Sequence, residues 1–378
     1  MKLMHLSDLH LGKRVNGFSQ IPDQKFILSR ILEIVRQEQP QAVLIAGDVY
    51  DKSVPSAEAV ELFDRFLTSL VETGTDVLLT SGNHDSAERI AFGARLLSEA
   101  RVYVSPVYDG TVTTVEKEDE FGKVRFYLLP FLKPAHVRPH FPETAIETYS
   151  DALGAALSVC DLSGDTRHVL LAHQLVTGAE RSESEDISIG GTDNIDADVF
   201  QRFDYVALGH LHRPQNVGTG MRYCGSPLKY SFSEANHQKS VTMIHLGEKG
   251  DVRIDTIPLK PMHDMKCIRG SYMELTARSF YADTDLQECY LRVTLTDEED
   301  IPNALSRLRA VYPLIMKLDY DNLRTRQQHS PLNEVALPEN SPLELFAMLY
   351  EIQNNAPMSQ EETDYIRALI EKIQEDNL

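Results

Sequence analysis

Five apolar segments of this sequence, each typical of a buried β-strand, run into Asp, Asn or His where the segment ends. Ligands of open α/β sheets bind in the crevice beyond the carboxyl ends of the strands, so we expect these polar side chains to lie close together. The segments are Leu3–Leu6, Ala42–Ala46, Val77–Leu79, Val169–Ala172 and Tyr205–Leu208, and the residues that follow them are Asp8, His10, Asp48, Asn83, His84, His173, His210 and His212.

Each of these residues has a simpler explanation when it is considered alone. Asp8 and Asp48 could cap a helix or make a turn. Asn83 follows a Gly, as turn residues often do, and His173 could be a buried histidine with its hydrogen bonds satisfied. Five separate strand ends that all carry oxygen or imidazole ligands are hard to explain in this way. The pattern therefore predicts a metal site.

The number of candidate ligands indicates two metal ions. Residues two apart in an extended chain point the same way, so each Asp-x-His or His-x-His pair can present two ligands to one site. Two-metal sites, with ions roughly 3.5–4 Å apart, activate a water and stabilise the attacking and leaving oxygens of phosphoryl transfer. A mixture of N and O ligands without thiolate suits Mn, Fe or Zn and does not choose among them. The seven candidates are Asp8, His10, Asp48, Asn83, His173, His210 and His212.

Apolar strands alternate with amphipathic helices up to about residue 105, which predicts βαβ units and an α/β fold. Helices are predicted at 24–37, 56–72 and 149–159. The second of these carries Val60, Phe63, Leu67 and Leu70 at helical spacing. Further short β-like segments extend to Ile257, so we expect mixed sheets flanked by helices. The charged run from Arg181 to Asp186 is predicted to be a solvated loop near the metal site.

A chain of 378 residues is too long for one ordinary core. Pro258-Leu259-Lys260-Pro261 is predicted to be a linker, which gives a first domain at 1–260. Strands at 290–296 and 314–320 and a helix at 301–311 predict a small α/β domain at 261–326. A polar linker at 327–340 then precedes two helices at 341–378, which begin at capping boxes headed by Ser341 and Ser359.

The formal net charge of −20 argues against a surface that is basic throughout. A local basic rim, for example Lys13, Lys52 and Lys133, could still exist, so charge alone does not decide between nucleic acid and a small substrate. The four cysteines show no Cys-x-x-Cys spacing and are expected to be reduced thiols. No apolar run approaches 18 residues, so we expect no transmembrane helix and a cytoplasmic protein.

The motifs Asp8-x-His10, Gly47-Asp48, Gly82-Asn83-His84-Asp85 and Gly209-His210-x-His212 together resemble those of the calcineurin-like metallophosphoesterases. Residues 5–12, 46–51, 207–213 and 223–227 further resemble the SbcD family of bacterial nucleases, and this likeness extends over nearly the whole chain, weakly after residue 260. The resemblance implies a four-layer fold in which mixed β-sheets are flanked by helices. It also implies a manganese-dependent DNA nuclease with two ions.

In such a nuclease Asp48 would bridge the two ions. Asp8, His10 and His212 would complete one site, and Asn83, His173 and His210 the other. His84 would not be a ligand but would stabilise the transition state or protonate the leaving oxygen. The alternative for His84 is a turn residue hydrogen-bonded to Asp85.

The resemblance also implies a set of partners. The protein would cleave double-strand ends and hairpins, as exonuclease and endonuclease, with an SbcC-like ATPase in DNA repair, recombination and replication, and would be associated with the nucleoid. Residues 261–326 would cap the DNA. The C-terminal helices would dock on the ATPase, or alternatively on the chain's own core, through the apolar stripes Leu343, Phe346 and Leu349, and Tyr365, Leu369 and Ile370. A homodimer through helices such as 56–72 is expected.

Two other functions are compatible with parts of the sequence. A standalone nucleotide phosphodiesterase or phosphatase fits the acidic net charge, but a small substrate needs neither the extra domain nor the terminal helices. Lys52 stands where phosphoprotein phosphatases of the superfamily carry a phosphate-binding Arg, and Lys lacks the bidentate fork of Arg. A non-catalytic scaffold is disfavoured because every expected ligand is present.

Overall fold

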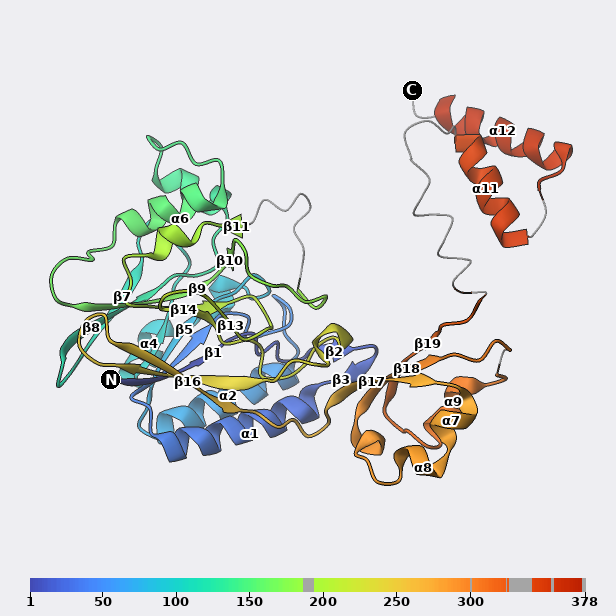
Figure 1. Cartoon of the computed structure of the whole chain (residues 1–378). Helices are drawn as coiled ribbons and strands as arrows, with labels where there is room; N and C mark the ends of the chain where they lie inside the picture. The colour runs from blue at the N-terminus through green and yellow to red at the C-terminus, as the bar shows by residue number, and fades with distance from the viewer. Residues whose placement is uncertain (186–193, 300, 324, 326–341, 355–356, 376–378) are drawn as a thin grey trace. The chain divides into compact units, whose positions relative to one another are not determined.

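The computed structural model describes residues 1–185, 194–299, 301–323, 325, 342–354 and 357–375 (Figure 1). The chain divides into two compact units. One unit comprises Met1–Cys267, Thr284–Arg292 and Tyr312–Lys317, and the other comprises Ile268–Asp283, Val293–Val311 and the described part of Leu318–Leu378. Among the described residues, no helix is long and apolar enough to span a membrane.

The first unit contains two six-stranded mixed sheets. In the first sheet the order is β16-β15-β1-β4-β5-β6, with β1, β4, β5 and β6 parallel and β15 and β16 antiparallel to their neighbours. The predicted strands at 3–6, 42–46 and 77–79 are confirmed. The bounds are β1 Lys2–Leu6, β4 Ala42–Ala46, β5 Asp76–Thr80, β6 Val102–Val104, β15 Ser240–Leu246 and β16 Val252–Pro258.

The second sheet has the order β13-β14-β12-β9-β8-β7. Its central strands β8, β9, β12 and β14 are parallel, and an antiparallel strand lies at each edge. The predicted strands at 169–172 and 205–208 are confirmed. The bounds are β7 Thr113–Asp119, β8 Gly122–Leu128, β9 Arg167–His173, β12 Tyr205–Gly209, β13 Gln215–Gly218 and β14 Met221–Tyr223.

The two sheets pack face to face, and helices cover their outer faces. Because side chains alternate along a strand, Leu44 of β4 joins a core shared with the second sheet, whereas Val43 and Ile45 join the core beneath the helices α1, Ile21–Glu38, and α2, Ala57–Glu72. On the other side, α6, Tyr149–Ser158, packs on the second sheet. Figure 1 shows α1 and α2 on one side of the sandwich and α6 on the other. The predicted four-layer fold is confirmed.

The helix α2 begins where the sequence predicts, because the Ser56 hydroxyl caps it by accepting a hydrogen bond from the N–H of Ala59. Its inward face is formed by Ala59, Phe63, Phe66 and Leu70. Val60 lies beside this row and is 44% exposed, so it does not belong to the buried face.

Short elements connect the layers. The short strands are β2 Arg14–Val15, β3 Phe18–Ser19, β10 Leu175–Val176 and β11 Asn194–Ile195. The short helices are α3 Ala87–Ile90, α4 Ala94–Glu99 and α5 Pro134–Val137, with the 3-10 turns η1 Arg138–His140, η2 Ala197–Phe200, η3 Phe232–Glu234 and η4 Leu286–Glu288.

The predicted linker at 258–261 is wrong in its first half. Strand β16 continues through Pro258, and the N–H of Leu259 donates to the carbonyl of Lys239, which extends the edge of the sheet. The side chain of Leu259 is buried. The apolar Leu259 therefore belongs to the first core, although two prolines flank it closely.

A three-stranded sheet of order β17-β18-β19 follows, with the short helices α7 and α8 between β17 and β18 and α9 between β18 and β19. The strands predicted at 290–296 and 314–320 are confirmed. The predicted helix at 301–311 is shorter, because Asn303 takes a left-handed conformation with φ 54° immediately before the helix. The bounds are β17 Met265–Gly270, α7 Tyr272–Thr276, α8 Arg278–Tyr281, β18 Tyr290–Leu295, α9 Ala304–Arg309 and β19 Ile315–Tyr320.

Two helices, α11 Pro342–Asn354 and α12 Gln360–Glu375, complete the described chain. The predicted capping box of Ser359 is confirmed, since its hydroxyl accepts from the N–H of Glu362 and the Glu362 carboxylate accepts from the N–H of Ser359. Ser341, the predicted head of the other capping box, lies outside the described residues. The Tyr350 hydroxyl donates to Glu362, which joins the two helices.

Candidate metal centre

The carboxyl ends of parallel strands from both sheets meet at one place. Asp8, Asp48 and Asn83 follow β1, β4 and β5 of the first sheet. His173 is the last residue of β9 in the second sheet, where it pairs with Gly209, the last residue of β12. The Nδ1 atom of His173 lies 2.8 Å from the carbonyl oxygen of Ala46 in β4, so this hydrogen bond joins the two sheets at the site.

The backbone is strained at the turns that carry the candidate ligands. Asp8, His10, Asp48 and His210 have φ angles of 53°, 43°, 50° and 107°, in a region that residues other than Gly seldom occupy. Each such residue costs on the order of 1–3 kcal/mol, and the surrounding structure must hold it in place. Positive φ at four ligand positions indicates that the fold places these side chains at the expense of local backbone stability.

Two glycines allow the ligand loops to approach each other. A Cβ atom on Gly82 would overlap the Asp48 carboxylate, and one on Gly209 would overlap the carbonyl oxygen of Ala46 and the ring of His173. Gly82 is therefore required by close contact between neighbouring loops of the first sheet, and Gly209 by close contact between the two sheets.

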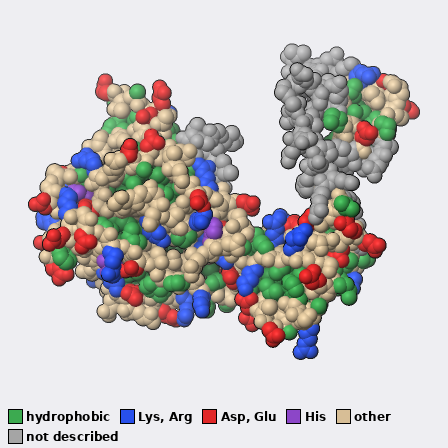
Figure 2. All heavy atoms as spheres, in the orientation of Figure 1, with side chains coloured by type: hydrophobic (Ala, Val, Ile, Leu, Met, Phe, Trp, Pro, Cys, Tyr) green, Lys and Arg blue, Asp and Glu red, His purple; other side chains and the backbone are tan. Residues whose placement is uncertain are grey.

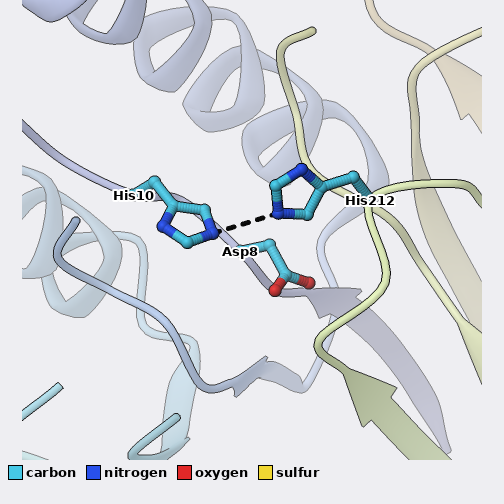
Figure 3. Close-up of side chains that lie close together, drawn as sticks. All are labelled: Asp8, His10 and His212. Carbon is cyan, nitrogen blue, oxygen red and sulfur yellow. Dashed lines mark hydrogen bonds between the residues drawn. The ribbon is translucent and has the colours of Figure 1, made fainter. Parts of the chain in front are cut away.

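One candidate ligand group consists of Asp8, His10 and His212, whose ligand atoms lie within 4.8 Å of one another. Figure 3 shows the two imidazole rings turned toward each other beside the Asp8 carboxylate, and the Nε2 atoms of the two rings are 3.1 Å apart. All three side chains are buried. Two imidazole nitrogens whose lone pairs converge next to a buried carboxylate fit a divalent cation well.

The other candidate ligands surround Asp48. Its Oδ2 atom lies 3.3 Å from Nε2 of His173 and 3.6 Å from Nε2 of His10, so this carboxylate stands between the two ligand groups. The amide oxygen of Asn83 lies 3.0 Å from Nε2 of His173 and 3.0 Å from Nδ1 of His210. The structure thus brings together all seven residues predicted as ligands.

The pKa values indicate how the charges balance before a cation binds. Burial lowers the pKa of His210 to about 3 and that of His10 well below its usual value, so both rings are neutral and keep a lone pair. Burial alone would raise the pKa of Asp48, but His173 and the other nearby histidines lower it below its usual range. The pKa of His173 is lowered by burial and raised by Asp48, with a net rise to about 9. A cation would replace the proton of this pair.

His84 lies next to the ligands but in a different environment. Its backbone N–H donates to the Asp48 carboxylate over 2.9 Å, and its Nδ1 lies 3.0 Å from the carbonyl oxygen of Asp51. The Nε2 atom is 3.9 Å from Oδ2 of Asp48. The side chain of His84 is 19% exposed, whereas that of His10 is 1% exposed. His84 is therefore the histidine of this group that a substrate can reach most easily.

Asp85, which the sequence offered only as a partner for His84, connects two ligand loops. Its carboxylate accepts hydrogen bonds from the N–H groups of Val49, Tyr50 and Gly82. Burial and the nearby Asp48 raise the pKa of Asp85 to about 6. The only sequence feature that pointed to this structural role of Asp85 was its position directly after His84 in the motif.

Other supporting residues had no signal in the sequence. The Gln24 amide donates to the carbonyl of His10 over 2.7 Å, and the Tyr230 hydroxyl donates to the carbonyl of Leu9, so both hold the first ligand loop. The prediction of a solvated loop at 181–186 is wrong for Glu185, which is buried and accepts a hydrogen bond from the N–H of His212 over 2.7 Å. Asp186 lies outside the described residues.

The chain is similar to known proteins along most of its length. Residues 1–214 match the calcineurin-like phosphoesterase family, and residues 261–354 match the type 5 capsule protein repressor C-terminal domain. A similar protein is the SbcD subunit of the nuclease SbcCD from Staphylococcus epidermidis, which is 30% identical over 379 residues, covering 99% of each chain. The crystal structure of a dimetal phosphatase from Danio rerio is 13% identical with a TM-score of 0.37 and covers 69% of this chain and 99% of that chain. The chain belongs to the SbcD family of nuclease subunits, which are calcineurin-like metallophosphoesterases.

Proposed function

We propose that this hydrolase is a two-metal DNA nuclease that cleaves phosphodiester bonds at double-strand ends and hairpins, as both exonuclease and endonuclease. The observation that carries the proposal is the convergence of seven carboxylate, amide and imidazole ligands from two sheets in one buried centre. Similarity along the whole chain to a subunit of the nuclease SbcCD supports DNA as the substrate.

The distances support a division of the ligands between two ions, and we propose Mn²⁺ among the metals that this donor set accepts. Asp8, His10 and His212 would hold one ion, and Asn83, His173 and His210 the other, with Asp48 bridging. When bound, two such ions supply an activated water and neutralise charge on the phosphate.

His84 would act on the leaving oxygen. Its Nδ1–H can donate to the Asp51 carbonyl, which fixes the ring and leaves Nε2 on the side of the Asp48 carboxylate. A protonated Nε2 in this position would stabilise the negative charge of the transition state and donate a proton to the leaving group. We propose this role and not that of a ligand.

The parts outside the metal centre would bind partners. Residues 261–326 would cap the DNA, and the helices within 341–378 would dock on an SbcC-like ATPase. The linker predicted at 327–340 lies outside the described residues. The partial exposure of Phe346, Leu349, Tyr365 and Leu369 on α11 and α12 supports docking over burial in the chain's own core. A homodimer is supported by exposed apolar side chains on α2 and the segment that follows β5, among them Val60, Phe92 and Leu96.

The charge of the molecule favours one alternative. A net charge of −20 suits a standalone phosphodiesterase or phosphatase that acts on nucleotides. Acidic and basic side chains are interspersed on the face seen in Figure 2. A DNA substrate would then depend on local basic groups and on the partner for binding.

One assay separates these functions. Mn²⁺-dependent cleavage of linear and hairpin duplex DNA should be measured beside hydrolysis of bis-p-nitrophenyl phosphate, with and without the ATPase. We expect cleavage of both DNA substrates that increases with the ATPase. Hydrolysis of the small phosphodiester alone, under all conditions, would reject the nuclease in favour of the standalone enzyme.

A further inference from the structure

His212 is held at three points by residues that are not ligands. Its backbone N–H donates to Glu185 over 2.7 Å, and its carbonyl oxygen accepts from the Lys239 ammonium over 2.7 Å. Its ring Nδ1 lies 2.8 Å from the Ser184 hydroxyl and 3.4 Å from the Glu234 carboxylate. The main chain and the side chain of this one residue are therefore both fixed.

Glu234 and Lys239 form the centre of this arrangement. Both are almost fully buried, at 0% and 4% exposure. One oxygen of Glu234 accepts from Lys239 over 2.5 Å, and the other accepts from the Ser184 hydroxyl over 2.5 Å and from the N–H of Tyr230 over 3.2 Å. The Lys239 ammonium also donates to the hydroxyl of Ser226. Both carboxylate oxygens of Glu234 thus accept at least one hydrogen bond.

A buried ion pair of this kind contributes little net stability. Removing two charges from water costs several kcal/mol per ion, and apolar residues of similar volume often replace such a pair without loss. A role other than stability is therefore expected for this pair. Glu234 lies beside the ring of His212 and Lys239 binds its carbonyl oxygen, so together they can hold this residue in place.

The directions of the hydrogen bonds determine the tautomer of His212. Glu234 acts as an acceptor only, because its two oxygens accept from the Lys239 ammonium, the Ser184 hydroxyl and the N–H of Tyr230. Ser184 uses its single hydrogen to donate to Glu234, and its oxygen must then accept from His212. Nδ1 of His212 carries the hydrogen, and the lone pair lies on Nε2, the atom that faces Nε2 of His10.

We propose that Glu234, with Ser184 and Lys239, positions His212 as a metal ligand by fixing its tautomer and its ring. The inference rests on the proposed two-metal function, and it assigns Glu234 and Lys239 as positioning residues that do not touch the substrate. Outer partners of ligating histidines typically change metal affinity about 10- to 100-fold when they are lost.

The test compares Glu234→Gln with Asp119→Asn. The Gln amide has a single acceptor oxygen, so either Ser184, which holds the ring of His212, or Lys239, which holds its carbonyl oxygen, loses its acceptor. Asp119→Asn breaks another ion pair, with the buried Arg167 between β7 and β9, which has no contact with the metal centre among the described interactions. Mn²⁺ binding to metal-free protein is measured by calorimetry, and thermal unfolding is measured alongside.

We expect Glu234→Gln to weaken binding of one Mn²⁺ ion about 10- to 100-fold and to change binding of the other less than about threefold. Asp119→Asn should bind both ions as the wild type does, although it also unfolds at a lower temperature. Unchanged Mn²⁺ affinities in Glu234→Gln would overturn the inference while the proposed function stands. A wild-type protein that binds no Mn²⁺ would overturn both.

A double variant separates positioning from folding. Glu234→Gln combined with Lys239→Met no longer leaves an ammonium buried without its counter-charge, so the unfolding temperature should recover in part. The weakened Mn²⁺ affinity should remain, because the double variant also lacks the ammonium that holds the carbonyl oxygen of His212. Recovery of the affinity together with the stability would show that Glu234 acts only on folding and would overturn the inference.

Discussion

At the scale of single residues, His84 differs from its neighbours in what its ring can reach. The histidines proposed as ligands are buried and point at one another or at Asp48. The ring of His84 stacks edge-on against His10 at 4.8 Å between centroids and is held through Nδ1 by the carbonyl of Asp51. A ring that is anchored at one nitrogen and partly exposed is suited to proton transfer.

His84→Ala should therefore retain Mn²⁺ and DNA binding but lose cleavage about 10²- to 10⁴-fold, the usual contribution of a general acid. His245→Ala, on β15 next to the edge strand β16, replaces a histidine without disturbing the metal centre and should cleave at the wild-type rate. Calorimetry, a DNA-binding assay and initial rates measure the three properties. Near-normal cleavage by His84→Ala would contradict the assignment.

At the scale of secondary-structure elements, the sequence predicted the sheets and the ligand set because both follow from local patterns. Strand ends such as Val77–Leu79 and Val169–Ala172 are apolar runs followed by a polar residue, and parallel strands bring such ends together. The contacts that hold the ligands were not predictable. Tyr230 donates a hydrogen bond to Leu9, which is 221 positions away in the sequence. Glu185 lies within a run of charged residues that is typical of an exposed loop, so its contact with His212 could not be predicted.

The close contact of β12 with β4 gives a test at this scale. Gly209→Ala would place a Cβ atom against the carbonyl of Ala46 and the ring of His173, so we expect a loss of about 1–3 kcal/mol in unfolding free energy and weaker Mn²⁺ binding. Gly154→Ala in α6 meets nothing within 4 Å and should gain up to about 1 kcal/mol. Urea denaturation measures both, and equal effects of the two substitutions would contradict the packing argument.

The ion pair of Asp119 in β7 with Arg167 in β9 predicts that the stability of the protein depends on pH. Burial alone would raise the pKa of Asp119, but Arg167 and the amino terminus of Met1 lower it to about 2, below the value of about 3.9 expected in the unfolded chain. The ionised Asp119 carboxylate thus makes its full contribution to the free energy of unfolding above about pH 4. This contribution is lost as the pH falls through about 2.

Asp119→Asn should accordingly be about 3 kcal/mol less stable than the wild type at neutral pH, as expected when one partner of a buried pair is removed. The difference between the two proteins should decrease from about pH 4 to about pH 2. Urea denaturation at several pH values measures it. A difference that stays constant over this range would mean that Asp119 does not carry this dependence.

At the scale of the whole molecule, an acidic chain with partly exposed apolar side chains on its last helices suggests a protein that depends on a partner. Removal of residues 341–378 should abolish co-elution with an SbcC-like ATPase in size-exclusion chromatography. Mn²⁺-dependent hydrolysis of bis-p-nitrophenyl phosphate should continue at the wild-type rate, since none of the proposed metal ligands lies in these helices. Unchanged co-elution would reject docking through α11 and α12.

The proposed function requires that seven residues from two sheets hold two ions and that both ions are needed for DNA cleavage. It is tested most directly by titrating metal-free protein with Mn²⁺ while counting bound ions and measuring cleavage of hairpin duplex DNA. We predict two ions per chain, cleavage that follows occupancy of both, and loss of both properties in Asp48→Asn, which removes the shared carboxylate. Cleavage at full rate without metal, or with Asp48→Asn, would contradict the account.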